Sequence, residues 1–259
     1  MSVVVAALCL GMAAVAWWAW ENARRRTYAV PEGIQRDIQI PHEAEFELYH
    51  NAFSLCSMKV RFCLAELGIA YKSHHVDLVE TGAYENIRRE FLAVNPGGTV
   101  PVLVHRGHPI YESHSQIRYA AASAPQGSQR LVPERASLRV EMESWIDRSS
   151  LTDDPLAHGE ESAGNAVPGL TLPLFATMIE RIPYWRILEG VLFHFDKKRP
   201  FLFLMLKRLG IARFDRAGPA ARFLARSLRR LPRTWTHSKS SSPRARGRGF
   251  SARASHSPT

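Results

Sequence analysis

The sequence divides into five stretches that differ in how apolar and charged positions alternate. An apolar run comes first, and a mostly polar stretch follows it. Short apolar segments then mix strand and helix spacing, helical spacing continues alone, and the chain ends in arginine and serine. The five predictions are an anchor with a basic flank (1–26), a linker (27–45), an α/β domain (46–124), an all-helical domain whose completeness is open (131–215) and a basic, mostly disordered tail (216–259).

The first apolar run has the properties of a membrane-spanning helix. Residues 3–20 form a run of eighteen residues without a charge. This length is close to that of a membrane-spanning helix, which requires about 20 mostly apolar residues. Tryptophans cluster at its end and Arg24-Arg25-Arg26 follow, as at a membrane interface. A cleaved signal peptide would instead have positive charge before the run and small residues at its end. We therefore expect a single-pass anchor, with the globular part on the cytoplasmic side.

Residues 46–124 are expected to form a mixed sheet with helices packed on it. Phe46–Tyr49 alternates as a strand does, and helical spacing predicts a helix at Met58–Leu67, with Gly68 just beyond its end. Arg106-Gly107 between two apolar runs predicts a hairpin. The other expected elements are a strand at 69–78, a helix at 84–92, strands at 100–104 and 109–111, and a helix at 113–122 with Ser113 as its N-cap.

Three short motifs occur in order within this stretch. They are Ser54-Leu55-Cys56-Ser57-Met58-Lys59-Val60-Arg61, Asn95-Pro96-Gly97-Gly98-Thr99-Val100-Pro101 and Glu112-Ser113. The first is similar to the signature of zeta-class glutathione transferases, although Leu55 stands where those enzymes have serine. The second resembles the family's segment leading to its cis-proline, and the third its Glu/Gln-Ser pair. Residues 46–122 thus resemble the thioredoxin-like N-terminal domain of zeta-, theta- or beta-like glutathione S-transferases.

The resemblance implies a fold and a ligand. The fold would be a thioredoxin-like α/β domain followed by an all-α domain and preceded by the transmembrane helix. The ligand would be glutathione, as co-substrate and without a metal, held by Val100, Pro101, Glu112 and Ser113. Ser113 at a helix start would offer an N–H and a hydroxyl to the γ-glutamyl carboxylate, and Glu112 would accept from the ammonium. The backbone of Val100 would pair with the cysteinyl unit as an added strand does.

The catalytic residue has two candidates. Ser54 falls where zeta and theta enzymes keep a serine, and its hydroxyl could stabilise the glutathione thiolate beside a helix N-terminus. Cys56 falls where beta-class bacterial enzymes keep a cysteine, which could form a mixed disulfide with glutathione. Each residue also has a structural interpretation, because Ser54 could simply cap the helix and Cys56 could be a small buried apolar residue.

The second half of the chain predicts helices at 133–149, 170–182, 184–195 and 200–211. It lacks the Ser/Thr-x-x-Asp capping box that the family has in its C-terminal domain. Because that domain supplies the pocket for the electrophile in the family, the absence favours an alternative without catalysis.

Charge and cysteine usage narrow the possible functions. The net charge of +10 lies in the tail, since residues 213–259 hold twelve Lys/Arg and one acid. The three cysteines, at positions 9, 56 and 63, form neither a disulfide framework nor a metal-ligand pattern.

The first hypothesis is a membrane-anchored enzyme that transfers the glutathione thiol to an electrophilic small molecule or uses glutathione for reduction. The alternative is a catalytically silent module that acts as a membrane-tethered adaptor. A homodimer is expected from the family, and specific nucleic-acid binding is not.

Overall fold

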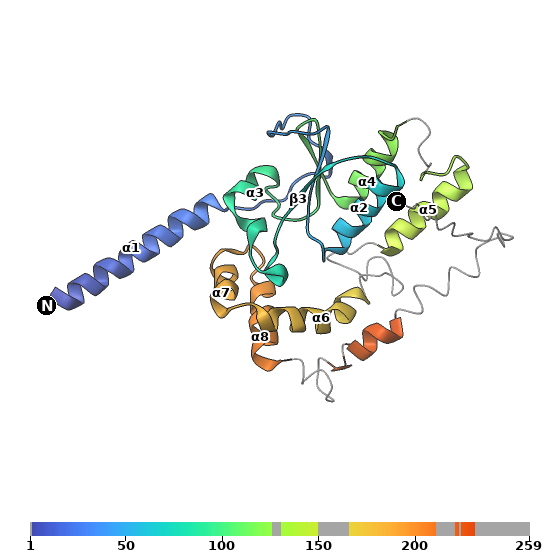
Figure 1. Cartoon of the computed structure of the whole chain (residues 1–259). Coiled ribbons are helices and arrows are strands. Elements are labelled where there is room, and N and C mark those ends of the chain that lie inside the picture. Colours follow the sequence, from blue (N-terminus) through green and yellow to red (C-terminus); the bar gives the residue numbers. More distant parts are fainter. Residues whose placement is uncertain (1, 126–130, 150–165, 211–220, 223, 231–259) are drawn as a thin grey trace, which may run out of the picture.

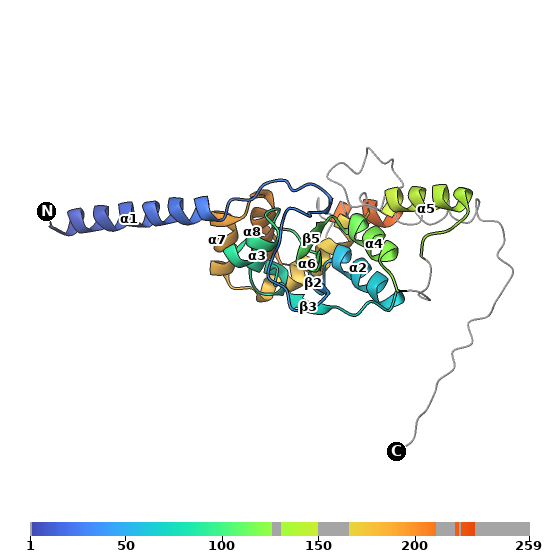
Figure 2. The same ribbon diagram turned by 90° about the horizontal axis from the view of Figure 1, so that it is seen from above.

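The computed structural model describes residues 2–125, 131–149, 166–210, 221–222 and 224–230 (Figure 1). Helix α1 (Ser2–Arg24) projects from a globular part that contains a sheet and further helices (Figures 1 and 2). Within the described residues, Val3–Arg24 is the one helix long and apolar enough to cross a bilayer, with a mean hydropathy of 2.0. A mixed sheet with a helical part and one apolar N-terminal helix was expected, and this architecture is confirmed.

The sheet has five strands in the order β1-β5-β4-β2-β3. Strand β2 pairs in parallel with β3 and antiparallel with β4, and β5 pairs antiparallel with β4 and β1. Their bounds are Gly33–Ile34 (β1), Phe46–His50 (β2), Lys72–His75 (β3), Val102–His105 (β4) and His108–Tyr111 (β5). The arrangement is the expected mixed sheet, and β4 and β5 form the expected hairpin.

Both faces of the sheet are covered because its central strands are apolar on both sides. Helices α2 (Leu55–Glu66) and α4 (Ser113–Ala122) pack in the same core cluster as Leu103, whereas Val102 and Val104 belong to a second cluster with Phe91 of α3 (Arg89–Val94). Adjacent residues of β4 thus point to opposite faces. This two-sided burial fixes the register of the strands that carry the site.

The stretch expected to be a linker takes part in the sheet. Gly33 and Ile34 form the edge strand β1 opposite Tyr111 and Ile110. Ile40 is buried, and its amide donates to the carbonyl of Gly107 at 2.8 Å. Two paired residues flanked by polar positions and prolines produce no detectable period, which is why the sequence pattern does not predict this strand.

Two helices in the structure have bounds that differ from those predicted from the sequence. Helix α2 begins at Leu55 instead of Met58, because Ser54 caps it. The helix expected at 84–92 is divided into a 3-10 turn at Glu85–Ile87 and helix α3, with extended backbone at Arg88 between them. Within this stretch, Tyr84 and Ile87 pack in one core cluster, whereas Phe91 packs in another.

The second half of the chain forms the expected helices, with small shifts at their ends. They are α5 (Ala136–Ser149), α6 (Val167–Arg181), α7 (Tyr184–Phe193) and α8 (Lys198–Leu209). Helix α5 buries none of its residues and reaches α4 through a hydrogen-bonded ion pair, Arg118 Nη1 to Glu143 Oε1 at 2.9 Å. In the predicted tail, residues 221–222 and 224–230 are helical. The rest of the tail lies outside the described residues.

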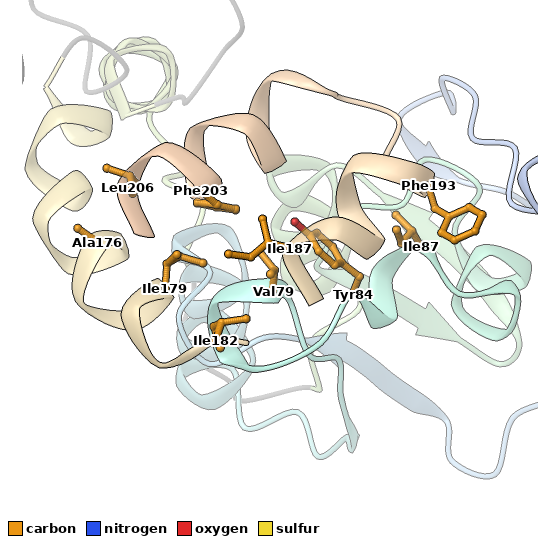
Figure 3. Packing of buried hydrophobic residues seen from close by; sticks show 10 residues of the cluster. All are labelled: Val79, Tyr84, Ile87, Ala176, Ile179, Ile182, Ile187, Phe193, Phe203 and Leu206. Carbon is orange, nitrogen blue, oxygen red and sulfur yellow. The ribbon is translucent and has the colours of Figure 1, made fainter. Parts of the chain in front are cut away.

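Helices α6–α8 share one hydrophobic core with the α/β part (Figure 3). Val79, Tyr84 and Ile87 come from the segment after β3, and they pack against side chains of all three helices. The cluster consists of Val79, Tyr84, Ile87, Ala176, Ile179, Ile182, Ile187, Phe193, Phe203 and Leu206. The two halves therefore do not have separate interiors.

The tightest contact across this core is between Tyr84 and Gly190 of α7. A Cβ atom at Gly190 would lie 2.3 Å from the Cζ and Oη atoms of Tyr84. Alanine would gain up to about 1 kcal/mol of helix propensity, but overpacking costs about 1–3 kcal/mol. The clash should prevail, because Tyr84 is only 1% exposed and has no room to retreat.

We expect Gly190→Ala to lower the free energy of unfolding of the full chain by roughly 1–2 kcal/mol, since the clash outweighs the propensity gain. Urea denaturation in detergent micelles, followed by tryptophan fluorescence, measures the change. Leu188→Ala on the same helix, where the side chain is 51% exposed, is the control and should change stability by at most about 0.5 kcal/mol. A Gly190→Ala variant as stable as wild type would show that Tyr84 does not pack tightly against α7.

Candidate functional site

The loop between β2 and α2 is held by Asn51. Its side-chain amide donates to the carbonyl of Val76 at 2.9 Å and to the hydroxyl of Thr81 at 3.0 Å, and its side-chain oxygen accepts from the amide of Phe53 at 2.9 Å. Asn51 is 1% exposed. Asn51 is not among the predicted site residues, although an asparagine directly after a strand is a common turn signal.

Ser54 caps α2 and keeps its hydroxyl proton available. Its Oγ accepts from the backbone N–H of Ser57 at 3.2 Å. Within the described residues no acceptor takes the Ser54 hydroxyl proton, and the side chain is half-buried at the edge of a cavity. Capping and donation are therefore compatible, because an oxygen can accept one hydrogen bond while its own O–H donates another.

Cys56 lies in the first turn of α2, between two cavities of about 640 Å³ each. Its side chain is half-buried and contributes to the lining of both. Cys63 on the same helix is different, since it is 5% exposed in the core and burial raises the pKa of its thiol to about 11. Of the two cysteines on α2, only Cys56 is placed for chemistry.

The segment before β4 has the backbone geometry that its sequence motif predicts. The Val100–Pro101 peptide bond is cis. Within the described residues, the amide and carbonyl of Val100 have no hydrogen-bond partner. Gln116 of α4, which is fully buried, donates from Nε2 to the carbonyl of Pro101 at 2.8 Å and to that of Ile110 at 2.9 Å. Gln116 is a second supporting residue that the sequence motifs do not indicate.

Glu112, and not Ser113, is the N-cap of α4. The Glu112 carboxylate accepts from the amides of His114 and Ser115 at 2.7 and 3.1 Å. The hydroxyl of Ser113 donates to the same carboxylate at 3.2 Å. Glu112 has φ of +67°, outside the usual range for a non-glycine residue, and this turns its side chain over the start of the helix. The prediction of Ser113 as N-cap is therefore wrong, because that residue already belongs to the helix.

A polar cavity lies over the start of α4. It is lined by Glu32, Cys56, Lys59, Glu112, Ser113, His114, Ser115, Arg118, Ile146 and Asp147, and we call it the polar cavity. It contains side chains of both signs. The Nζ atom of Lys59 lies 3.0 Å from Nε2 of His114. Burial lowers the pKa of both groups, and the positive charge of each neighbouring cation lowers that of His114 further.

An apolar cavity lies on the other side of Cys56, between the sheet domain and α6–α8. It is lined by Asn51, Phe53, Ser54, Leu55, Cys56, Leu78, Glu80, Asn86, Gly98, Thr99, Val100, Val167, Thr171, Phe175, His194, Phe195, Arg199, Leu202 and Phe203, and we call it the apolar cavity. His194 stacks on Phe195 with ring centroids 4.5 Å apart. Burial lowers the pKa of His194 to about 4, so that the ring is neutral at pH 7.

The structure thus gathers the six predicted site residues around α2 and α4. Ser54 and Val100 line the apolar cavity, Glu112 and Ser113 line the polar cavity, and Cys56 lines both. Pro101 lies behind them and is buried, with its carbonyl tied to Gln116.

Comparison with known proteins identifies the domain that contains these residues. Residues 53–123 match the family model for the N-terminal domain of glutathione S-transferases. The chain contains a glutathione S-transferase N-terminal domain. This assignment confirms the family resemblance that the three motifs indicate, and it leaves the role of each residue a prediction.

Individual relatives match the same part of the chain. Glutathione S-transferase F10 of Arabidopsis thaliana is 30% identical over 92 residues, which cover 36% of this chain and 41% of that protein. The tetrachloro-P-hydroquinone reductive dehalogenase of Sphingobium chlorophenolicum is 32% identical over 77 residues, 30% of each chain. The chain therefore spans less than half the length of these curated relatives.

A solved structure extends the likeness in fold beyond the first domain. The beta-etherase LigF from Sphingobium sp. strain SYK-6 has a TM-score of 0.53 and 19% sequence identity, and the match covers 73% of this chain and 69% of that chain. At this identity the comparison shows a shared fold, with the helical part included.

Proposed function

We propose that this protein binds glutathione and activates its thiol for transfer to an electrophile. The observation that carries the proposal is the position of Cys56 between a cavity of mixed charge and an apolar one, with Ser54 two residues away in the lining of the apolar cavity. Glutathione has a zwitterionic γ-glutamyl end, which suits the mixed charges of the polar cavity. An apolar electrophile suits the apolar cavity, and the thiol would lie between them.

The backbone supplies the remaining contacts. The amide and carbonyl of Val100 are available to pair with the cysteinyl unit of glutathione, as an added strand would. The N–H of Ser113, in the first turn of α4, has no acceptor within the described residues and would bind the γ-glutamyl carboxylate. Lys59 adds a positive charge in the same cavity. The Glu112 carboxylate would accept from the ammonium group.

The Ser54 hydroxyl would stabilise the thiolate. The thiol of glutathione loses its proton to solvent, and the sulfur anion accepts a hydrogen bond from Ser54 near the positive end of α2. The thiolate then attacks the electrophile, so that a C–S bond forms and the leaving group departs with its electron pair. The alternative of a silent module predicts no activation of this kind.

Cys56 supports a second candidate activity, glutathione-dependent reduction. It lies in the first turn of α2 and borders both cavities, so a thiolate there could attack the glutathione sulfur of a glutathione mixed disulfide. The substrate thiolate leaves, and a second glutathione thiolate then attacks the Cys56–glutathione disulfide, which releases glutathione disulfide and restores Cys56. One relative carries the name reductive dehalogenase, which is a reductive activity within the same family.

We further propose that α1 anchors the protein in a membrane, with the globular part on the cytoplasmic side that Arg24, Arg25 and Arg26 favour. The base of α1 is attached to the globular part. The Trp17 ring lies edge-on to Phe193 at 6.1 Å, and Trp18 Nε1 donates to the carbonyl of Leu192 at 3.4 Å. These contacts would hold the helical part close to the bilayer surface.

Glutathione binding is the first test. The full chain in detergent micelles should bind reduced glutathione in calorimetry, with a dissociation constant in the micromolar to low-millimolar range. Ser113→Ala should weaken binding by about tenfold, because the Ser113 hydroxyl can turn from Glu112 to the γ-glutamyl carboxylate and alanine removes this donor. Ser123→Ala at the other end of α4 is the control and should bind as wild type does. A folded wild-type chain that does not bind would support the silent adaptor instead.

Two assays distinguish the proposed catalytic roles of Ser54 and Cys56. Ser54→Ala should reduce glutathione conjugation to chlorodinitrobenzene by about tenfold to a hundredfold, the value of a hydrogen bond to a charged group. Ser54→Thr keeps a hydroxyl and should retain most of the rate. Cys56→Ser should abolish only the glutathione-dependent reduction of hydroxyethyl disulfide. Activities unchanged in both Ser54→Ala and Cys56→Ser would refute both catalytic assignments.

The anchor can be tested without disturbing the contacts of Trp17 and Trp18. The double variant Leu8→Arg/Met12→Arg places two charges in the span, at about 2.5–3.5 kcal/mol each near its centre. Alkaline extraction of cell membranes should then release the variant, whereas wild type and the control Leu8→Ile stay in the pellet. Wild type found in the supernatant, or the double variant retained with the membranes, would contradict the anchor.

A further inference from the structure

The outer face of helix α7 is apolar. The helix turns Ile187, Gly190 and Phe193 into the protein. The side chains on its opposite face are between 45% and 58% exposed, and all of them are aromatic or aliphatic. They are Tyr184, Trp185, Leu188 and Leu192. A helix at the surface of a soluble protein normally has charged and polar residues on this side, so the pattern indicates that something other than water covers it.

The two charged residues of α7 lie beside this face and not on it. Arg186 Nη1 donates to Oε2 of the half-buried Glu189 at 2.9 Å, and the Arg186 guanidinium lies 4.1 Å from the centre of the Trp185 ring. The other oxygen of Glu189 is 3.6 Å from Nη1 of Arg25 in α1. Each charge thus has a partner of opposite sign, and the outer face presents only apolar and aromatic side chains.

The attachment of α1 determines the environment of this face. Helix α7 lies at the end of the globular part from which α1 projects (Figures 1 and 2). Trp17 packs on Phe193, and Trp18 donates to the carbonyl of Leu192. At 1.5 Å per residue, Trp17 lies about 10 Å further along α1 than Arg24. If Arg24 lies among the headgroups, the end of α7 is at the boundary with the acyl chains, where interfacial helices bury their apolar face.

The backbone at this end of α7 is prepared for a medium with little water. The last carbonyls of a helix have no partner within the helix, and in lipid an unsatisfied carbonyl is costly. Here Lys197 Nζ donates to the carbonyls of Val191 and Leu192 at 3.0 and 3.1 Å, and Trp18 Nε1 donates to that of Leu192 at 3.4 Å. The carbonyls nearest to α1 therefore need no water.

We propose that the outer face of α7 is inserted in the membrane interface beside α1, and that the lipid bilayer is its partner. Two contacts, one across the bilayer and one on its surface, would fix the orientation of the globular part. The inference rests on the proposed anchoring by α1, but it adds a contact that can be absent while α1 remains in the membrane.

The test measures the surroundings of a single nitroxide label on the full chain in lipid nanodiscs. The background is Cys9→Ser/Cys56→Ser, since the buried Cys63 does not react. One cysteine is added at a time, as Leu188→Cys on α7, Leu8→Cys within the span or Val140→Cys on α5. Helix α5 lies at the end of the globular part opposite α1, and Val140 is 72% exposed, so this label is the control for water (Figures 1 and 2).

Electron paramagnetic resonance reports collisions of each label with oxygen, which concentrates in lipid, and with a nickel chelate, which stays in water. The ratio of oxygen to nickel collisions at Leu188 should exceed that at Val140 several-fold, as it should at Leu8. Trp185→Cys provides a second label on the same face if Leu188→Cys does not fold.

The other outcomes contradict the proposal in different ways. A Leu188 label as open to nickel as the Val140 label, while the Leu8 label is in lipid, would leave the anchor intact and overturn the insertion of α7. Few collisions with either reagent at Leu188 would mean that protein, such as a second copy of the chain, covers the face instead of lipid. A Leu8 label in water would overturn the anchor and the insertion together.

Discussion

The packing of the segment after β3 against α6–α8 is the interaction on which the rest of this structure depends. Val79, Tyr84 and Ile87 belong to the same core as seven side chains of the helical part. Tyr84 approaches α7 so closely that only glycine fits opposite its ring. The same segment carries Glu80 and Asn86 to the apolar cavity, so the packing that joins the two halves also builds the proposed binding site for the second substrate.

Two buried amides give the site its rigidity on the side of the sheet. Asn51 joins the β2–α2 loop to Val76 and Thr81, and Gln116 joins α4 to the carbonyls of Pro101 and Ile110. Each satisfies backbone or side-chain groups that would otherwise be buried without partners, at a cost of about 1–3 kcal/mol per group. Ser54 and Val100 therefore occupy defined positions even though both lie in loops, and preorganisation of this kind favours binding.

The sequence predicts the elements whose signals are local. The strand at Phe46, the helix at Ser113–Ala122 and the hairpin at Arg106-Gly107 follow from spacing and turn residues, and all are present. The motifs also led to the expectation that Ser54, Cys56 and Glu112 lie in one region, and these residues line the two cavities beside α2. What the sequence could not supply depends on distant contacts. Strand β1 exists because β5 offers an open edge to two residues.

Other unpredicted features have the same origin. The expected helix at 84–92 is interrupted because two cores compete for its apolar residues. Glu80 looks like any charged surface residue until α8 brings Arg199 beside it. The N-cap of α4 was assigned to Ser113 because serine is a better cap than glutamate by residue type. Only the positive φ of Glu112, which is a property of the folded turn, turns its carboxylate onto the helix start.

This cap has a consequence for how an anion could enter the polar cavity. The amides of His114 and Ser115 already donate to Glu112, so these two N–H groups are not available to an incoming carboxylate. What remains is the N–H of Ser113 and the ammonium of Lys59. Burial lowers the pKa of Lys59, while the negative charges of Cys56, when ionised, and of Glu112 raise it. A carboxylate arriving beside it would raise this pKa further, because an opposite charge favours the protonated form. A ligand carboxylate would pair with Lys59, and a ligand ammonium would pair with Glu112. A zwitterion that carries both groups therefore fits this cavity better than a simple anion does.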